Sequence, residues 1–257
     1  MLSDITPVIL TLNEEPNIER TLAQLEWASD IVVVDSLSMD RTVALAEKNP
    51  AVRVFQRPFD SHAEQWNFAI EQTGIKTNWI LALDADYVLT PEFVQELRNL
   101  RDDGQNDAYS VGFCYRVGER LLRGALYPPV TVLFRRGRVQ YVQEGHTQRL
   151  RVGGPVGKLK IKIDHDDRKP LSRWLLAQDC YMRLEAEHLI RTPWLELSLP
   201  DKIRRFPLVA PFFVFAYCYF GKRLFLDGKA GLYYALQRLV AEALLSLRLI
   251  ETQLKKR

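Results

Sequence analysis

The fold of this 257-residue chain is decided by the stretch Trp79-Ile80-Leu81-Ala82-Leu83-Asp84-Ala85-Asp86. Five consecutive apolar residues are typical of a strand that is buried on both faces, as in parallel sheets covered by helices. The strand runs directly into Asp-X-Asp. Neighbouring carboxylates at a strand's end can hold a hard divalent cation, which takes its other ligands from water and substrate phosphates. The stretch therefore predicts a metal site at the edge of a parallel sheet.

Toward the N-terminus, short apolar runs alternate with amphipathic segments. The predicted strands are Val8–Leu12, Ile31–Asp35, Val52–Phe55 and Trp79–Leu83, and the predicted helices are Asn17–Trp27, Arg41–Lys48 and Ala63–Gln72. Such alternation indicates an α/β domain with right-handed crossovers. Ligands of these sheets bind at the carboxyl ends of the strands. We therefore expect Glu14, Asp35, Asp84 and Asp86 to converge on one edge.

The charge is distributed unevenly along the chain. Residues 1–100 contain 7 Lys and Arg against 16 Asp and Glu, which leaves 28 basic and 16 acidic residues for 101–257. An acidic half suits a cation that bridges to phosphate, and a basic half suits an anionic acceptor or an anionic lipid surface. Chance clustering on a solvated surface is the alternative.

Beyond Pro91 the alternation ends. Strands are predicted at Tyr109–Val117, Val130–Phe134, Val139–Val142 and Leu159–Ile163, and a long helix at Leu171–Ile190. These segments predict an antiparallel second half over the same core. We expect one domain over 1–190, with a donor and metal half at 1–100 and an acceptor half at 101–190, followed by a helical region at 191–257.

The helical region contains an aromatic segment at Phe206–Phe220, which is 15 uncharged residues long and includes two prolines. The flanking basic residues are Lys202, Arg204, Arg205, Lys222 and Arg223. A membrane-spanning helix needs about 20 apolar residues. Residues 202–226 therefore predict an interfacial segment that lies on a membrane without crossing it. A buried helix or hairpin is the alternative. Leu232–Ile250 continues as an amphipathic helix.

Three cysteines, Cys114, Cys180 and Cys218, have no disulfide or zinc-ligand spacing. A reducing compartment fits this pattern. The first residues have no basic segment followed by a long apolar run, so we expect no export signal. The expected location is cytoplasmic, peripheral at the inner face of the plasma membrane.

Four motifs stand in register along the first half of the chain. They are Thr11-Leu12-Asn13-Glu14-Glu15-X-X-Ile18, Val33-Val34-Asp35-Ser36-X-Ser38-X-Asp40-X-Thr42, Gln65-X-Asn67 and Asp84-Ala85-Asp86. These motifs resemble those of the family 2 glycosyltransferases with the GT-A fold, and more closely those of the lipopolysaccharide-core β-1,4-glucosyltransferase-like branch. The resemblance implies an inverting transferase that uses a nucleotide sugar and Mg²⁺ or Mn²⁺. It places Glu14 and Asp35 near the base and ribose, and Asp86 on the metal.

By the same resemblance we expect donor-binding and metal-binding sets. The donor-binding set is Thr11, Asn13, Glu14, Asp35, Ser36, Gln65, Asn67, Asp84 and Ala85, and the metal set is Asp86, Asp84 and His165. Two positions depart from the family. Leu37 stands where the family commonly has Gly, and Tyr87 stands where this branch often has Glu.

The acceptor half must supply a general base, because an inverting transfer deprotonates the acceptor hydroxyl as it attacks. Glu144 follows a predicted strand and resembles the family's Val-His-Glu motif, with Gln143 where His is usual. We take Glu144 as the candidate base; a surface Glu is the alternative. His165 ends another strand where the family often has His, although a lone His is commonly structural.

The sequence thus predicts a transferase that moves a hexose from a nucleotide-diphosphate sugar, a UDP-sugar by preference, to a lipid-linked, lipopolysaccharide or exopolysaccharide acceptor. A polyprenyl-phosphate glycosyltransferase is the alternative within the class. A nucleotidyltransferase would need a Gly-rich triphosphate loop, and a Rossmann oxidoreductase would need Gly-X-Gly-X-X-Gly, but the first strand leads into Asn13-Glu14-Glu15. A non-catalytic membrane-binding module would not need the acidic motifs. No nucleic-acid partner is expected, and the oligomeric state stays open.

Overall fold

The computed structural model describes residues 1–144 and 147–255, with only the backbone of Glu144 and Thr147. The chain forms two compact units. The first comprises Met1–Cys114 and Tyr127–Arg168, and the second comprises Tyr115–Leu126 and Lys169–Arg257. Helix α5 (Leu171–Arg191), grouped with the first domain in the sequence analysis, belongs to the second unit.

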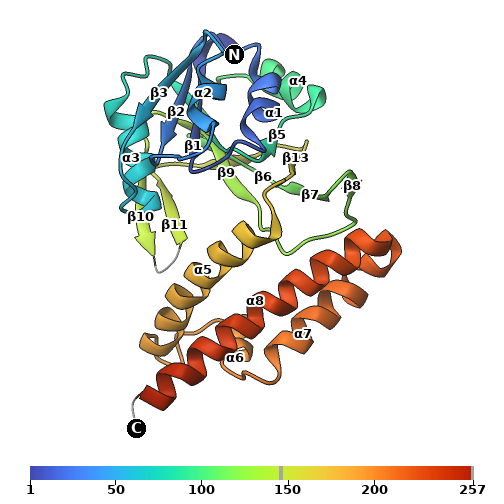
Figure 1. Cartoon of the computed structure of the whole chain (residues 1–257). Helices are drawn as coiled ribbons and strands as arrows, with labels where there is room; N and C mark the ends of the chain where they lie inside the picture. The colour runs from blue at the N-terminus through green and yellow to red at the C-terminus, as the bar shows by residue number, and fades with distance from the viewer. Residues whose placement is uncertain (145–146, 256–257) are drawn as a thin grey trace. The chain divides into compact units, whose positions relative to one another are not determined.

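The first unit is built on a seven-stranded sheet (Figure 1). The strands outside the second unit are β1 (Ile5–Thr11), β2 (Ile31–Asp35), β3 (Val52–Gln56), β4 (Trp79–Asp84), β5 (Tyr87–Val88), β6 (Ala108–Val111), β9 (Val130–Arg135), β10 (Val139–Glu144), β11 (Thr147–Val152), β12 (Val156–Lys158) and β13 (Ile163–His165). The helices are α1 (Ile18–Leu22), α2 (Thr42–Ala46), α3 (His62–Gln72) and α4 (Pro91–Asn99). Strand β7 (Phe113–Val117) continues into the second unit, where it pairs with β8 (Arg120–Leu121).

The order of the sheet is β12-β6-β9-β4-β1-β2-β3. Strands β4, β1, β2 and β3 are mutually parallel, and β9 runs antiparallel to both β4 and β6. This mixed α/β sheet confirms the predicted fold class. In register, Thr11 pairs with Asp35 and Leu10 with Asp84, so β1, β2 and β4 end at one level.

Alternate residues of each parallel strand face opposite layers of helices. Ile31 and Val33 pack in a cluster with residues of α1, α2 and α4, whereas Val32 and Val34 pack in a cluster with residues of α3. Because side chains alternate across a strand, a continuous apolar run is what a sheet covered on both faces requires. Burying each such side chain contributes about 1.5–3 kcal/mol relative to exposure.

One predicted strand, Leu159–Ile163, is wrong. The chain instead forms β12 before it and β13 at its end. The amides of Lys160 and Ile161 donate to the Glu96 carboxylate of α4, at 2.8 and 2.9 Å, so they do not join a ladder. The prediction Tyr109–Val117 likewise divides at Gly112 into β6 and β7.

The second unit is mainly helical. Besides α5 it contains α6 (Leu199–Arg204), α7 (Ala210–Ala216) and α8 (Gly228–Lys255), with a π turn at Tyr217–Gly221. Arg204 lies at its centre, where its Nε is 3.1 and 3.0 Å from the two carboxylate oxygens of Glu242 and its Nη1 contacts Glu185. No helix of the described residues is long and apolar enough to span a bilayer. The predicted helix Leu232–Ile250 lies within α8.

The loop after β2 contains a strained position. Leu37 has φ of 62°, in the left-handed region, and its side chain is 49% exposed. Asn13, in the loop after β1, also has positive φ at 54°. Asn adopts this conformation readily, but a branched apolar residue does so at a cost of about 1–2 kcal/mol. The structure thus explains why glycine suits position 37.

We predict that Leu37→Gly raises the free energy of unfolding by about 0.5–1 kcal/mol, because the relief of strain exceeds the entropy cost of glycine. Urea denaturation of the whole chain measures it. Leu37→Ala is the matched control, since it removes the same side chain and keeps the strain. Equal destabilisation by both variants would mean that packing of the Leu37 side chain outweighs the strain.

Candidate active site

The carboxylate of Asp35 joins the loop after β2 to β1. It is fully buried. Its Oδ1 accepts hydrogen bonds from the hydroxyls of Thr11 and Ser38 at 2.8 and 2.5 Å. Its Oδ2 accepts from the Ser38 amide at 2.8 Å and from the Gln56 amide group at 3.4 Å. Asp35 therefore fixes the loop, and its expected contact with a base or ribose stays a prediction.

The loop after β1 is hydrogen-bonded to the loop after β2. The amide of Asn13 donates to Ser38 Oγ at 2.7 Å, and the amide of Met39 donates to Asn13 Oδ1 at 2.8 Å. One residue further, the amide of Glu14 donates to Thr42 Oγ1 at 2.7 Å. These reciprocal bonds hold Asn13 and Glu14 in place at the edge of the sheet.

Gln65 and Asn67 use their amide groups within the protein. The Gln65 side chain donates to Ser36 Oγ at 2.8 Å. Asn67 pairs with the backbone of Tyr141 on β10, donating to its carbonyl at 2.9 Å and accepting from its amide at 3.0 Å. The structure thus brings Gln65 to Ser36, whereas Asn67 holds the hairpin that carries Glu144.

The Asp-X-Asp segment leaves β4 at the same edge. Ala85 is buried, and its carbonyl accepts a hydrogen bond from Thr21 of α1 at 2.6 Å. Asp84 is half-buried, whereas Asp86 is only 8% exposed. Among the described residues, the Oδ1 atom of Asp86 is buried and has no hydrogen-bond partner. Its Oδ2 lies 3.8 Å from Nε2 of His165.

Strand β13 brings His165 to this position. It pairs antiparallel with β5, so that His165 is opposite Tyr87, and the amide of Asp166 donates to the carbonyl of Asp86 at 2.9 Å. Burial raises the pKa of Tyr87 well above its usual value, so its hydroxyl stays protonated.

These donors fit a hard divalent cation in part. Carboxylate oxygens are the ligands that Mg²⁺ and Mn²⁺ prefer, and a buried carboxylate oxygen without a partner costs free energy unless something binds it. Within 1–144 and 147–255, however, no three His, Cys, Asp or Glu side chains gather closely enough to hold a metal by themselves. Such a site must complete its coordination with water or substrate oxygens.

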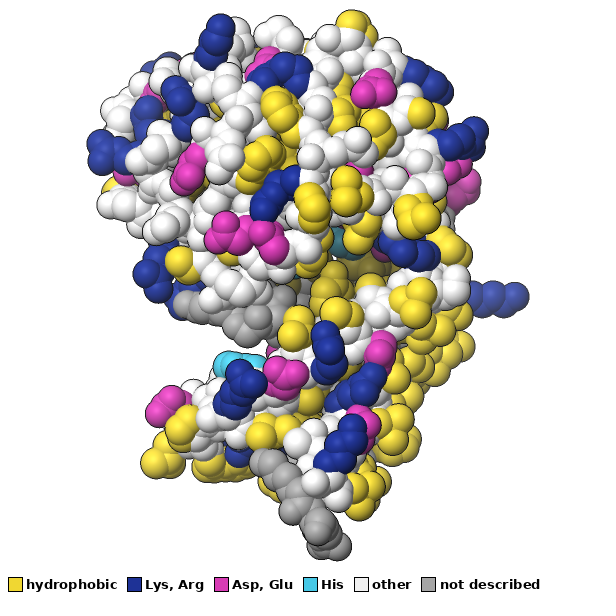
Figure 2. Space-filling model, turned by 60° about the vertical axis from the view of Figure 1, so that its left-hand side comes forward, with side chains coloured by type: hydrophobic (Ala, Val, Ile, Leu, Met, Phe, Trp, Pro, Cys, Tyr) yellow, Lys and Arg dark blue, Asp and Glu magenta, His cyan; other side chains and the backbone are white. Residues whose placement is uncertain are grey.

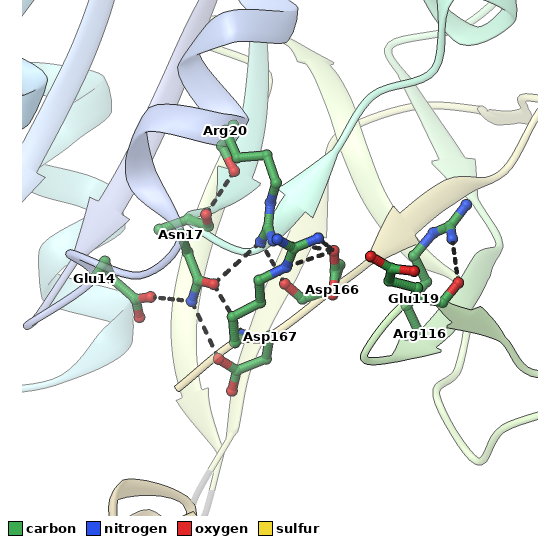
Figure 3. A network of polar contacts seen from close by, with 10 residues as sticks. Glu14, Asn17, Arg20, Arg116, Glu119, Asp166 and Asp167 are labelled. Atoms are coloured by element: carbon green, nitrogen blue, oxygen red, sulfur yellow. Dashed lines mark hydrogen bonds and ion pairs between the residues drawn. The ribbon is translucent and has the colours of Figure 1, made fainter. Parts of the chain in front are cut away.

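A second network, which the sequence analysis missed, connects the loop after β1 with the segment after β13 (Figure 3). Its hub is the buried Asn17, whose Nδ2 donates to Glu14 Oε2 at 2.8 Å and to Asp167 Oδ1 at 3.1 Å. Its Oδ1 accepts from Arg20 and from the Arg168 amide, at 3.1 and 3.0 Å. The sequence did contain a signal for this network, because polar residues stand on the first turn of the helix that follows the Asn-Glu-Glu motif.

Asp166 is neutralised within this network. Arg20 and Arg168 each lie 3.1 Å from its Oδ2, and Asp166 is 4% exposed. Burial lowers the pKa of the Arg20 guanidinium, while the charge of Asp166 opposes that shift. Guanidinium groups stay charged at neutral pH, so both cations remain beside this carboxylate. Asp166 is therefore held in an ion-pair cluster within the protein.

Glu144, the candidate base, is the last residue of β10. Its side chain lies outside the described residues, so its role stays a prediction.

Comparison with known proteins identifies the family of the chain. Residues 6–159 match the sequence profile described as Glycosyl transferase family 2. Over 106 residues the chain is 36% identical to an uncharacterized glycosyltransferase of Rickettsia bellii, covering 41% of the chain and 35% of that relative. The chain thus matches little more than a third of the length of that protein.

Over 213 residues the chain is 28% identical to the lipopolysaccharide core biosynthesis glycosyltransferase LpsC of Rhizobium meliloti, covering 73% of the chain and 72% of LpsC. The crystal structure of S. aureus TarS 1-349 in complex with UDP-GlcNAc superposes with a TM-score of 0.50 at 15% identity, covering 98% of the chain and 91% of TarS. That likeness shows the fold alone. The family profile covers more than half of the chain, including the Asp84-Ala85-Asp86 segment but not strand β13 with His165. The chain therefore belongs to glycosyltransferase family 2 and has the GT-A fold.

Proposed function

We propose that this enzyme is an inverting, metal-dependent hexosyltransferase that uses a UDP-sugar and acts on a lipid-linked or lipopolysaccharide acceptor. The observation that carries the proposal is the buried Asp86 Oδ1, which has no hydrogen-bond partner in the described chain while Oδ2 faces His165 Nε2 at 3.8 Å. The UDP-GlcNAc complex of TarS supports the donor class, and the name of LpsC supports the acceptor class.

On the donor side, Asp86 with His165 beside it would hold Mg²⁺ or Mn²⁺ together with water and diphosphate oxygens, and the ion would neutralise the diphosphate as it leaves. Asp84, the third predicted ligand, does not gather with these two into a three-ligand site among the described residues. Asn13 and Glu14 are the residues that we assign to the nucleoside, because their backbones are fixed at the edge of the sheet. Thr11, Asp35, Ser36 and Gln65 support that edge through their mutual hydrogen bonds.

On the acceptor side, an acceptor hydroxyl attacks the anomeric carbon from the face opposite the diphosphate. Glu144 takes the hydroxyl proton, the new glycosidic bond forms, and the electron pair of the broken bond leaves with the diphosphate. A positioned base contributes about 10²–10⁴-fold to such a step. Asn67 would position this base indirectly, through its two hydrogen bonds to Tyr141.

We predict that Asp86→Ala lowers UDP-sugar turnover by about 10²-fold or more, because the metal supplies several kcal/mol of charge stabilisation. UDP release from a panel of UDP-sugars, with Mn²⁺ or with EDTA, measures this. Asp103→Ala, at an exposed loop carboxylate, is the control and should match the wild type. Full turnover of the wild type in excess EDTA would rule out metal dependence.

We predict that Glu144→Gln keeps UDP affinity within about 2-fold and lowers kcat by about 10²-fold, the usual effect of losing a positioned base. Calorimetric titration with UDP and Mn²⁺ tests the first part, and acceptor-dependent turnover tests the second. Glu92→Gln, a surface carboxylate on α4, is the control. Near-normal turnover would assign the base to another carboxylate.

We further propose that the helical unit places the enzyme on the cytoplasmic face of the plasma membrane. Its support is a set of exposed apolar side chains, here called the aromatic face. These are Phe206, Leu208, Val209, Phe212, Phe213, Tyr217, Phe220, Phe225 and Leu226. Positions 209, 212, 213, 217 and 220 follow helical spacing on one side of α7 and its π turn, while Ala210, Pro211 and Cys218 are buried. Hydrophobic side chains gather along the helical unit in Figure 2.

The charge around the aromatic face favours an anionic lipid surface over a second copy of the chain. Between Lys202 and Lys229 the sequence has one acidic residue, Asp227, which is buried beside Arg123 at 3.2 Å. Of the flanking basic residues, Arg204 and Arg205 are directed inward, to Glu242 and to backbone carbonyls. Four basic residues remain at least partly exposed: Lys202, Lys222, Arg223 and Lys229. If two copies of the chain paired through the aromatic face, these like charges would repel one another. Each such charge near anionic lipid contributes about 1 kcal/mol.

We predict that the protein floats with vesicles containing anionic lipid and that binding falls with added salt. Replacing Phe212 and Phe220 by Ser should release it, since both side chains are more than 60% exposed. Phe215 is a poor target because it is partly buried and stacks on Tyr219 at 5.5 Å.

The control is Phe59→Ser, which removes an exposed aromatic side chain of the first unit. It should float like the wild type. A wild-type protein that stays in solution beside anionic vesicles at low salt would refute the membrane proposal and leave the proposed chemistry intact.

A further inference from the structure

An aromatic cluster packs around His165. The reaction proposed above gives the aromatic residues of this cluster no role. Tyr87 is the cross-strand partner of His165, with ring centroids 5.7 Å apart. The Tyr127 ring lies closer, at 4.7 Å with a tilt of 54°. Phe113 packs on both tyrosine rings, at 4.7 and 4.9 Å.

The two tyrosines are joined at their hydroxyls, whose oxygens are 2.6 Å apart. Tyr87 is 3% exposed, so the pair is fixed from the core side. Tyr127 is half-buried and comes from a loop about 40 residues farther along the chain. The hydroxyl bond therefore anchors a loop residue to the strand directly after Asp86.

This arrangement limits the orientation of the imidazole. A histidine ring can rotate about two side-chain bonds, and packing against two rings from different segments restricts that rotation. The observed orientation directs Nε2 toward Asp86 Oδ2 at 3.8 Å. A metal-binding imidazole needs this kind of support, and loss of outer support typically lowers metal affinity 10- to 100-fold.

We propose that Tyr127 is a positioning residue for the metal site: bonded to Tyr87, it holds the His165 imidazole toward Asp86. The inference rests on the metal role of His165 in the proposed function. It also assigns a use to Tyr87, one of the two positions at which the chain departs from the related sequences. Tyr87 then acts through the Tyr127 hydroxyl and supplies no metal ligand.

The test is a titration of the whole chain with Mn²⁺ in the presence of UDP. Electron paramagnetic resonance measures the bound Mn²⁺. Tyr127→Ala should weaken Mn²⁺ affinity by about 10-fold or more, and Tyr127→Phe by a smaller factor of about 2–5, since it removes only the hydroxyl anchor. Tyr109→Phe is the matched control, because Tyr109 is a buried tyrosine that packs on Trp79. It should bind Mn²⁺ like the wild type.

A double-mutant cycle separates positioning from general packing. In a His165→Ala background, Tyr127→Phe should have no further effect on Mn²⁺ affinity, because the group that it positions is gone. Equal losses in both backgrounds, or wild-type Mn²⁺ affinity in Tyr127→Ala, would overturn the inference. Wild-type protein that binds no Mn²⁺ with UDP would instead contradict the proposed function itself.

Discussion

The buried carboxylate of Asp35 connects two loops that are far apart in the sequence. By accepting hydrogen bonds from Thr11 and Ser38, it holds the loop after β2 against the loop after β1. Ser38 and Asn13 then complete the connection through their own bonds. Because a buried carboxylate is costly unless its oxygens are satisfied, these loops have little freedom to separate. Glu14 lies in one of the connected loops, where its amide bonds to Thr42, and Leu37 lies in the other with its left-handed conformation.

A second constraint brings in the far end of the first unit. The amide of Asp166 bonds to the carbonyl of Asp86, and Asn17 connects Glu14 with Asp167. The first connection reaches the predicted metal residue Asp86, and the second reaches the predicted donor residue Glu14. The acidic end of β4 therefore meets His165, and the next residue along the chain, Asp166, pairs with Arg20 and Arg168.

Much of this was predictable from sequence, because burial on both sheet faces leaves continuous apolar runs. Ile31–Asp35 was predicted at its observed bounds, and Trp79–Leu83 within one residue of β4. The structure of the segment Leu159–Ile163 was not predicted correctly, because the amides of Lys160 and Ile161 bond to the carboxylate of Glu96, which is distant in sequence. Asn17, Arg20 and Tyr127 escaped prediction for the same reason: their roles depend on partners that tertiary structure alone brings near. Asp35 and Asn67 were recognised by motif, but their contacts within the protein were not.

In the proposed function, Asp86 and its neighbours form an incomplete metal site that a nucleotide diphosphate completes. Calorimetric titration of UDP into the protein, with and without Mn²⁺, tests it most directly. Because no three metal-binding side chains converge among the described residues, we expect weak binding of either ligand alone and UDP affinity at least about 10-fold tighter with Mn²⁺. UDP affinity that is unchanged by Mn²⁺ would contradict a metal site of this kind.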